Sequence, residues 1–222
     1  MINAHNFLSS YQSFWAKTTP WLSSFIASLN KSGVERVFKP LEESEEARFR
    51  SINNETAFII FESPSLKIED ALLKCFDRLK FLPRTSIDEY VLDKNNEKII
   101  LELSSRMSLL YRVKQPIFNP LINGFGAIKS CYCDLIFNNT LCEIKSGDRK
   151  FNSTDFKQVI LYLSLNNFSK QYNFESIELF NPRTGFLINM GVSDLLESIS
   201  DFSPDEVFKE IINIPDNIDI YQ

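Results

Sequence analysis

Two carboxylates and one lysine lie close together near the middle of the chain. Asp134 is followed, after eight intervening residues, by Glu143, and Lys145 lies two positions beyond Glu143. Carboxylate oxygens are the hard ligands that Mg²⁺ and Mn²⁺ prefer, and these ions keep positions open for water and phosphate oxygens. A lysine beside such an ion can orient the attacking water or help to deprotonate it. These residue types indicate metal-assisted hydrolysis, provided that the fold brings them together.

A β-hairpin is the element expected to position these three side chains. Residues 131–137 and 140–146 are rich in strand formers. The two asparagines between these runs suit a two-residue turn, because asparagine tolerates the positive φ angles that such a turn needs. The register of that turn pairs Leu135 with Cys142. It also places Asp134 directly opposite Glu143.

This register separates the hairpin into two faces, because side chains alternate along a strand. The ionisable carboxylates and the amine share one face, while the other face is almost wholly apolar and carries Cys131, Cys133, Leu135, Phe137, Cys142 and Ile144. Two carboxylates directly opposite each other destabilise a sheet. A solvated face with Lys145 nearby is one explanation for this pair. A divalent cation held between the carboxylates is the other, and we favour it.

The spacing of these residues resembles a known family signature. Asp134 with Glu143-Ile144-Lys145 is similar to the D…(D/E)-x-K signature of the PD-(D/E)xK nuclease superfamily. Gln158 and Tyr162 look like the Q-x-x-x-Y element of its RecB-like branch, and they share one face of an expected helix. The resemblance covers residues 97–189. Cys133 stands where many members have a proline.

The resemblance implies a fold and a metal site. The expected fold is α/β (α+β), a restriction-endonuclease-like core with a central mixed β-sheet flanked by helices. It further implies a Mg²⁺ or Mn²⁺ ion held by Asp134, Glu143 and the main-chain carbonyl of Ile144. The family often has another acidic residue on the helix before the sheet, for which Glu102 is the first candidate and Glu97 the second.

The resemblance also implies roles for three further side chains. Lys145 would position the attacking water, and Gln158 would support the catalytic site. Tyr162 would contact the DNA or support the site from the same helix. Pairs such as Gln158 and Tyr162 are common on helices. Their support for the resemblance therefore comes mainly from the position of Gln158, thirteen residues after Lys145.

Charge is unevenly distributed along the chain, whose net charge is −5. Residues 197–222 hold seven acidic residues and one basic residue, whereas residues 104–150 hold seven basic and three acidic residues. A locally basic centre is compatible with a polyanionic partner. The candidate contacts to a phosphate backbone, each of which could instead be simply solvated, are Lys129, Arg149, Lys150 and, at the tip of an expected turn, Arg183.

The histidine and cysteine content excludes several classes of site. The single histidine, His5, excludes histidine-rich zinc sites and makes a Ser/His/Asp or Cys/His site depend on one residue near the start of the chain. Three of the four cysteines fall on the expected apolar face of the hairpin. Buried thiols, which behave as small apolar groups, are therefore favoured over a zinc or iron–sulfur site.

The remaining pattern predicts a helical first half and a mixed second half. Residues 1–95 are expected to form a mainly helical region for partner docking or substrate recognition, and residues 96–222 the nuclease-like core. Helices are expected over 5–30 with a break near Pro20, 42–50, 68–79, 97–112, 154–166, 192–199 and 205–212. Strands are expected over 56–62, within 117–146, and over 177–180 and 185–189, the last two flanking a turn at 181–184.

The combined expectation is a metal-dependent nuclease, with DNA more strongly favoured than RNA as substrate. A non-catalytic nuclease-fold subunit that binds nucleic acid or protein is the alternative, as is an RNase of the same fold. No membrane-spanning stretch or secretory signal is visible, which indicates a cytoplasmic protein. By analogy, such a nuclease serves mobile-element, restriction or antiviral defence systems, with a protein partner or a second copy of itself.

Overall fold

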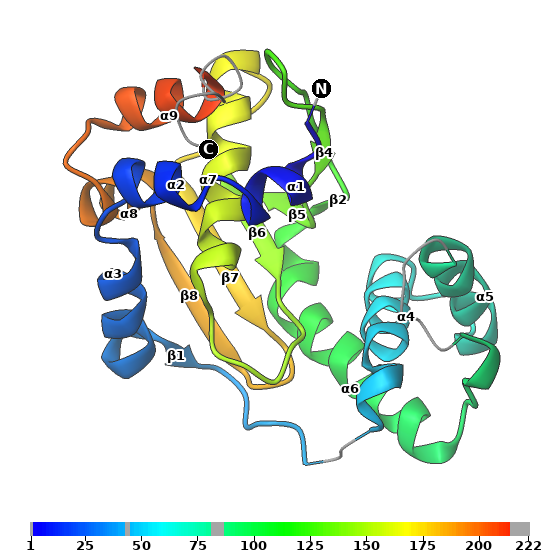
Figure 1. Cartoon of the computed structure of the whole chain (residues 1–222). Helices are drawn as coiled ribbons and strands as arrows, with labels where there is room; N and C mark the ends of the chain where they lie inside the picture. The colour runs from blue at the N-terminus through cyan, green and yellow to red at the C-terminus, as the bar shows by residue number, and fades with distance from the viewer. Residues whose placement is uncertain (1, 43–44, 81–86, 214–222) are drawn as a thin grey trace. The chain divides into compact units, whose positions relative to one another are not determined.

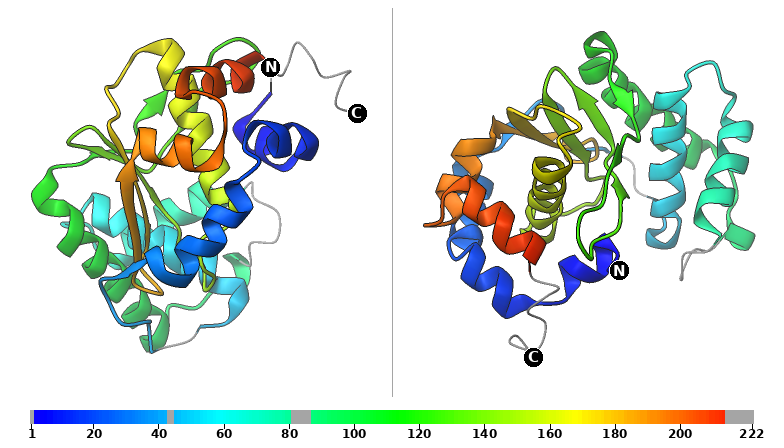
Figure 2. Two further views of the ribbon diagram at one scale, coloured as in Figure 1. Left: turned by 90° about the vertical axis from the view of Figure 1, so that its left-hand side faces the viewer. Right: turned by 90° about the horizontal axis from the view of Figure 1, so that it is seen from above.

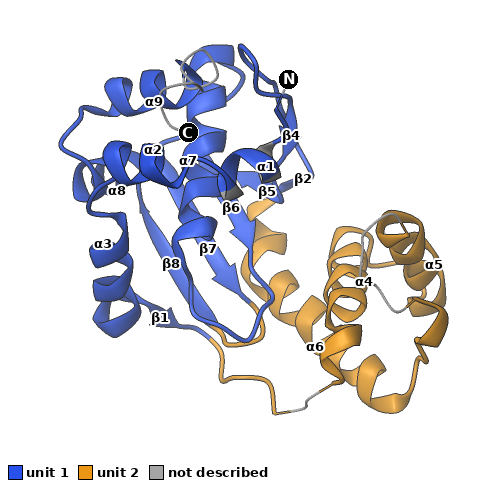
Figure 3. Ribbon diagram, viewed as in Figure 1, with its two compact units in different colours: residues 1–37, 116–181, 186–222 blue, residues 38–115, 182–185 orange. Residues whose placement is uncertain are grey.

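The computed structural model describes residues 2–42, 45–80 and 87–213, and the chain divides into two compact units (Figure 3). The sheet unit contains Met1–Val37, Pro116–Asn181 and Phe186–Gln222, and the helical unit contains Phe38–Gln115 and Pro182–Gly185. This division differs from the expected boundary between residues 95 and 96. The first helices of the chain belong to the sheet unit because their aromatic residues Phe7, Phe14 and Trp15 are buried in its core.

The sheet unit is built on a six-stranded mixed sheet. Its order is β1 (Glu35–Arg36), β8 (Phe186–Gly191), β7 (Ser176–Asn181), β6 (Thr140–Ile144), β5 (Leu135–Phe137) and β2 (Ile117–Phe118). Neighbouring strands are antiparallel except β6 and β7, which are parallel. Parallel neighbours require a crossover, which is supplied here by helix α7 (Ser153–Ser169). The expected mixed sheet flanked by helices is therefore present.

The register of the β5–β6 hairpin is confirmed. Leu135 pairs with Cys142, and the turn residues Asn138 and Asn139 have φ angles of 43° and 60°. Both asparagines therefore adopt the left-handed conformation that a tight hairpin turn requires. The hairpin register follows from local turn chemistry.

The first strand of the hairpin is shorter than expected, because the chain bends at Cys133 and Asp134. Residues before the bend form β4 (Cys131–Tyr132), which pairs with β3 (Leu121–Ile122) in a separate two-stranded sheet. The bend changes the face on which Cys133 packs: it lies in the same core as Ile136 and Leu141. The expectation that Cys133 shares a face with Leu135 throughout one continuous strand is therefore wrong.

Helix α7 lies at the centre of the sheet unit. It is enclosed between the sheet and a layer of helices from both ends of the chain, as the view from above shows (Figure 1, Figure 2). The layer comprises α1 (Ala4–Ser9), α2 (Gln12–Thr18), α3 (Leu22–Ser28), α8 (Val192–Ile199) and α9 (Pro204–Asn213). Eleven of the seventeen residues of α7 are buried, which is the pattern of a helix covered on all sides.

Helix α7 begins at a capping box. The Asn152 side chain accepts hydrogen bonds from Thr154 N and Asp155 N, and the Asp155 carboxylate accepts one from Asn152 N. The start of the helix was expected at residue 154, with Ser153, Thr154 or Asp155 as the cap. The structure places the cap at Asn152 and uses Asp155 as the reciprocal partner.

The helical unit consists mainly of α4 (Arg50–Glu62), α5 (Ile68–Leu79) and α6 (Lys94–Tyr111). Its core contains Ile52, Ile59, Leu72 and Cys75. The expected strand over 56–62 is wrong, because these residues form the second half of α4. A short apolar run is consistent with either a buried strand or a buried helix, and here the preceding residues extend the helix.

Two further helical expectations are corrected. The expected helix over 5–30 is divided into α1, α2, α3 and a π-helical turn at Leu29–Gly33, and Tyr11 between the first two has φ of 61°. Within 42–50, the described residues form only a 3₁₀ turn at Ala47–Phe49 before α4 begins, and residues 43–44 lie outside the described residues. The His5 side chain and residues 214–222 of the acidic tail also lie outside the described part.

Most other elements agree with expectation to within a few residues. Helices α5 and α8 have the expected bounds, and Asp93 caps α6 as part of the expected capping segment. No helix in the described part of the chain combines the length and the apolar character needed to cross a membrane.

Candidate active site

The functional candidates Glu143, Lys145 and Gln158 form one connected cluster between β6 and α7. Glu143 lies on β6 and is 2% exposed. Lys145 follows the strand, and its Nζ lies 3.0 Å from Glu143 Oε2 and donates a hydrogen bond of 2.7 Å to Gln158 Oε1. The low exposure of Glu143 is inconsistent with a solvated hairpin face. Because burial removes water from Glu143, the charge of its carboxylate must be stabilised by the protein groups that face it.

Helix α7 supplies the second half of the cluster. Gln158 Nε2 donates to the Tyr162 hydroxyl at 2.6 Å and lies 3.4 Å from Glu143 Oε2. The two α7 residues are four positions apart, so they lie on the same face of the helix. Gln158 therefore uses its oxygen toward Lys145 and its nitrogen toward Tyr162 and Glu143.

Tyr162 is buried beneath Gln158. Its side chain is 3% exposed, and burial, with a further contribution from the charge of Glu143, raises the pKa of its hydroxyl. A hydroxyl that is neutral and enclosed holds the amide of Gln158 in place. Of the two roles that the resemblance implied for Tyr162, its position fits support of the site.

Asp134 reaches the same cluster from the bend before β5. Its Oδ2 accepts a hydrogen bond of 2.7 Å from Ile144 N, which ties the carboxylate to the edge of β6. Burial and the nearby Glu143 carboxylate raise the pKa of Asp134, while Lys145 and the Ile144 N–H oppose that rise. The ladder ends at Leu135 and Cys142, so the bend replaces the expected Asp134–Glu143 backbone pairing.

Lys145 is a cation in this arrangement. Burial lowers the pKa of its ammonium group, but the carboxylates of Glu143 and Asp134 outweigh that effect, so its pKa is raised overall. A protonated amine donates hydrogen bonds and cannot accept a proton. Of the two roles considered for Lys145, the arrangement therefore supports orientation of water by donation.

One oxygen of Glu143 has no partner within the described part of the chain. Glu143 Oε2 faces Lys145 and Gln158, but Oε1 is buried without a hydrogen bond. Leaving a buried carboxylate oxygen unsatisfied is costly, because the group has lost its water without gaining a donor. Oε1 is the atom in this cluster that most clearly lacks a ligand.

The donor set fits a hard cation and does not fit a closed structural zinc site. Asp134 and Glu143 supply carboxylate oxygens, and Ile144 is the candidate for a main-chain carbonyl ligand. Among the described residues, no group of three or more His, Cys, Asp or Glu side chains is placed to hold a metal ion. Mg²⁺ is commonly held by only one or two carboxylates with several waters, so two carboxylates suffice for it.

Whereas the cluster belongs to the sheet unit, Glu102 belongs to the helical unit. It lies on α6 in the helical unit, where its Oε1 accepts a hydrogen bond of 2.8 Å from Arg106 Nε. Glu97, the second candidate for the additional acid, is on the same helix. Among the candidate metal ligands, Asp134, Glu143 and the Ile144 main chain lie together in the sheet unit.

The basic candidates near the site differ in how strongly they are held. Arg149 makes two hydrogen bonds, of 2.6 and 2.8 Å, to the carboxylate of Asp155, so it braces the start of α7. Lys150 Nζ donates to the Asn30 carbonyl at 2.8 Å, and Lys129 is exposed before β4. Both lysines are exposed on the sheet unit, and the ammonium group of Lys150 is held by that hydrogen bond.

Arg183 is held inside the helical unit. It is 5% exposed, pairs with Glu45 at 2.9 Å, and donates to Asn54 Oδ1 at 2.9 and 2.8 Å. These contacts occupy the guanidinium group in holding the turn at 182–185 against the segment before α4. The interpretation as a structural turn residue, rather than a substrate contact, agrees with this placement.

The cysteines are free thiols within the structure. Cys133 and Cys142 are buried, and Cys131 is half-buried. Burial is the main cause that raises the pKa of Cys131 to about 12, so the thiol stays protonated at neutral pH. A protonated thiol is a poor metal ligand. The expected packing role therefore accounts for these residues.

Asn181 is a site-supporting residue that the sequence did not reveal. It ends β7, is 2% exposed, and its Nδ2 donates to the Gly147 carbonyl at 2.7 Å and lies 3.3 Å from the Arg149 carbonyl. The loop that follows Lys145 is thereby tied to the neighbouring strand. The reciprocal pair Asn152 and Asp155 could have been found from the sequence as a capping box, but this link from Asn181 could not.

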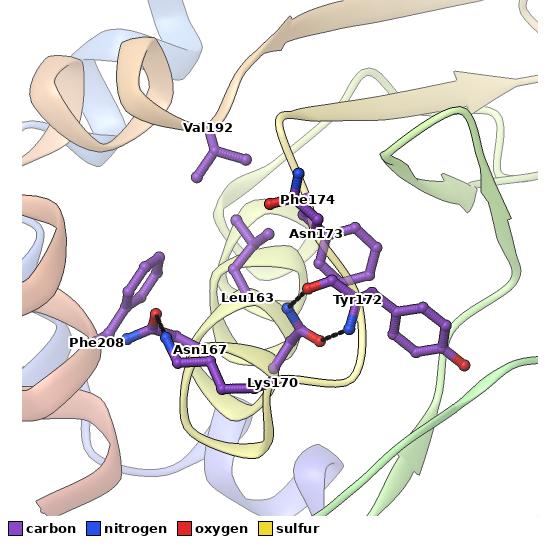
Figure 4. A pocket seen from close by; sticks show the side chains of 9 residues that line it. Leu163, Asn167, Lys170, Tyr172, Asn173, Phe174, Val192 and Phe208 are labelled. Atoms are coloured by element: carbon purple, nitrogen blue, oxygen red, sulfur yellow. Dashed lines mark hydrogen bonds between the residues drawn. The ribbon is translucent and has the colours of Figure 1, made fainter.

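A pocket of about 160 Å³ lies at the other end of α7 (Figure 4). Its polar side chains are mostly engaged within the protein: Asn166 makes hydrogen bonds of 2.9 Å with both the N–H and the carbonyl of Tyr172. Lys170 donates to Asn167 Oδ1 at 2.8 Å. Neither Glu143 nor Lys145 lines this pocket, so it is separate from the candidate site.

Comparisons of this chain with protein-family models, with curated proteins and with solved structures gave no match.

Proposed function

We propose that this protein is a metal-dependent nuclease of the PD-(D/E)xK type that hydrolyses phosphodiester bonds in DNA. The observation that carries the proposal is the Glu143 carboxylate, which is buried with Oε1 unpartnered while Oε2 faces the Lys145 ammonium. Asp134 supplies a second carboxylate to the same cluster. The resemblance of the spacing to the family signature adds independent support.

In this proposal, Asp134, Glu143 and the Ile144 carbonyl hold a Mg²⁺ or Mn²⁺ ion. When bound, the ion supplies Lewis-acid stabilisation of the phosphate and favours ionisation of a bound water. Lys145 donates a hydrogen bond that orients the attacking water, and its positive charge stabilises the negative charge that develops on the phosphate. Gln158 holds the Lys145 ammonium in position, and Tyr162 holds Gln158.

Cleavage assays with a matched pair of lysine variants test this proposal. Wild type, Lys145→Ala and Lys209→Ala would be incubated with plasmid, linear duplex, single-stranded DNA and RNA, each with Mg²⁺, Mn²⁺ or EDTA. Lys209 is an exposed residue of α9 in the same unit, so it controls for the loss of one positive charge. Low salt is used because affinity for phosphate backbones falls steeply with ionic strength.

The expected result is metal-dependent cleavage of DNA that Lys145→Ala reduces by about a hundredfold or more and Lys209→Ala leaves intact. Cleavage of RNA alone would replace the DNA assignment with the RNase alternative. Equal cleavage by wild type and Lys145→Ala would overturn the assigned site.

Metal binding provides a readout that does not require cleavage. Calorimetric titration of Mn²⁺ is expected to show binding to wild type and none to Glu143→Gln, because the variant loses one carboxylate charge at nearly constant shape. Absence of cleavage together with absence of binding to wild type would favour the non-catalytic, nuclease-fold subunit.

A further inference from the structure

A second candidate site lies on the side of α7 that contacts α2. A pocket of about 170 Å³ is formed there by residues of α2, the segment after it, the start of α3 and the first two turns of α7. None of the residues that line it is acidic. The polar groups that matter for its chemistry are Gln12, Trp15, Thr19, Ser153 and Lys157.

Lys157 places a buried positive charge in this pocket. Its side chain is only 7% exposed, and its Nζ lies 3.2 Å from Gln12 Oε1 and 5.3 Å from the centre of the Trp15 ring. No carboxylate pairs with it within the part of the chain that the structure describes. The ring face and the amide oxygen attract the ammonium group but carry no net charge. Burial lowers the pKa of Lys157, which reflects the cost of an ammonium group without a counter-ion.

Two further features of the pocket favour an anion. Trp15 is 1% exposed, and its indole Nε1, which can only donate, has no hydrogen-bond partner among the described residues. Ser153, the first residue of α7, also lines the pocket. Its hydroxyl is the group that this helix end offers, because Asn152 caps the N–H groups of Thr154 and Asp155. Within the described part of the chain, the pocket therefore contains an ammonium group without a carboxylate partner, a serine hydroxyl and a tryptophan whose indole N–H is unpartnered, and none of its lining residues is acidic.

We propose that this pocket binds a phosphoryl anion, supplied as free phosphate or as the terminal phosphate of a mononucleotide. Lysine binds phosphate as a point charge, whereas arginine is preferred for planar, bidentate recognition of carboxylates. The Ser153 hydroxyl adds a polar group suited to a tetrahedral anion, whereas the Thr19 hydroxyl donates to the Trp15 carbonyl at 2.8 Å. This site is distinct from the Glu143 cluster, and the proposal does not depend on nuclease activity.

Thermal unfolding of three proteins in EDTA tests the proposal: wild type, Lys157→Met and Lys17→Met. Lys157→Met removes the charge and keeps a chain of similar length, and Lys17 is an exposed lysine of α2 that serves as the matched control. Each would be titrated with phosphate, with 5′-dAMP, with deoxyadenosine, and with chloride at equal ionic strength. Phosphate also stabilises proteins by exclusion from their surface, so the difference between variants is the measured quantity.

Phosphate at ten times its dissociation constant is expected to raise the Tm of wild type and Lys17→Met by roughly 3–6 °C beyond the chloride control. Lys157→Met is expected to bind phosphate at least about tenfold more weakly than wild type, because it lacks the positive charge. A larger effect of 5′-dAMP than of phosphate assigns the site to a mononucleotide, and equal effects assign it to free phosphate. An equal rise in wild type and Lys157→Met, or a rise with deoxyadenosine that matches 5′-dAMP, would overturn the proposal.

Equilibrium dialysis of wild type against radiolabelled phosphate gives a readout that survives if Lys157→Met fails to fold. One phosphate per chain is expected, and Lys157→Arg, which keeps the charge, should retain it. No bound phosphate at millimolar concentration would overturn the proposal. Both readouts are independent of cleavage, so they separate this inference from the proposed nuclease function.

Discussion

Lys145 and Gln158 join the end of β6 to the first half of α7 through a hydrogen bond of 2.7 Å. The same lysine lies 3.0 Å from Glu143, and the same glutamine contacts Tyr162. The position of the ammonium group is therefore set from both the strand and the helix. This relationship makes Gln158 a positioning residue for the proposed reaction.

Gln158→Ala is expected to reduce cleavage by about tenfold, less than Lys145→Ala, because it frees the lysine without removing it. Tyr162→Phe removes only the hydroxyl beneath Gln158 and should have a smaller effect in the same direction. The measurement is kcat and KM on the substrate identified for wild type. A loss confined to KM would contradict a positioning role and indicate that Gln158 contacts substrate.

Asp134→Asn is expected to stabilise the metal-free protein at pH 7. Burial and Glu143 raise the pKa of Asp134 above its usual value near 4, so its ionised form is disfavoured in the folded state. The favourable contribution of Asp134 to the free energy of unfolding is therefore present at low pH, and it is lost as the pH rises through the raised pKa. Asparagine can still accept the hydrogen bond from Ile144 N, and it carries no charge that Glu143 would repel.

Denaturant unfolding in EDTA between pH 4 and pH 8 measures this difference. The gap between wild type and Asp134→Asn should widen as pH increases. With Mn²⁺ present, wild type should gain stability and the variant should not. A variant that is less stable than wild type in EDTA across this range would contradict the inferred repulsion.

Arg183→Met is expected to destabilise the helical unit by about 1–3 kcal/mol, because the buried Glu45 carboxylate loses one of its two described arginine partners and keeps Arg50, at 3.1 Å. The control is Arg48→Met, whose guanidinium group is exposed and pairs with exposed glutamates. Circular dichroism during thermal unfolding measures the loss. A folded Arg183→Met protein with normal stability and weakened DNA binding would instead assign Arg183 to the substrate surface.

The four cysteines are expected to react slowly with a thiol reagent in the native state at pH 8. Burial raises the pKa of Cys75 to about 11 and that of Cys131 to about 12, and Cys133 and Cys142 are enclosed. The thiolate is the reactive form, so both access and ionisation limit the rate. Unfolding in guanidinium should accelerate labelling of all four. Rapid native labelling of Cys133 would show that the core around the bend opens.

Local rules of sequence determined much of the hairpin and several helices. The Asn138–Asn139 turn sets the register of β5 and β6, because both residues can adopt positive φ. The bounds of α5 and α8 follow from their apolar periodicity. The spacing of Asp134, Glu143 and Lys145 also indicated which side chains would meet. These features depend on neighbours in the chain, so the sequence alone contains them.

Tertiary packing decided the features that depend on distant residues. The run at 56–62 is helical because it packs against α5 and α6, which its own apolar pattern could not reveal. The bend at Asp134 allows its carboxylate to reach Ile144 N, and α7 buries Glu143 and supplies Gln158. The Lys157 charge is enclosed by α2, a helix more than a hundred residues earlier in the chain. Burial and the identity of a charge's partners arise from the whole fold, because desolvation depends on every element that packs around the group.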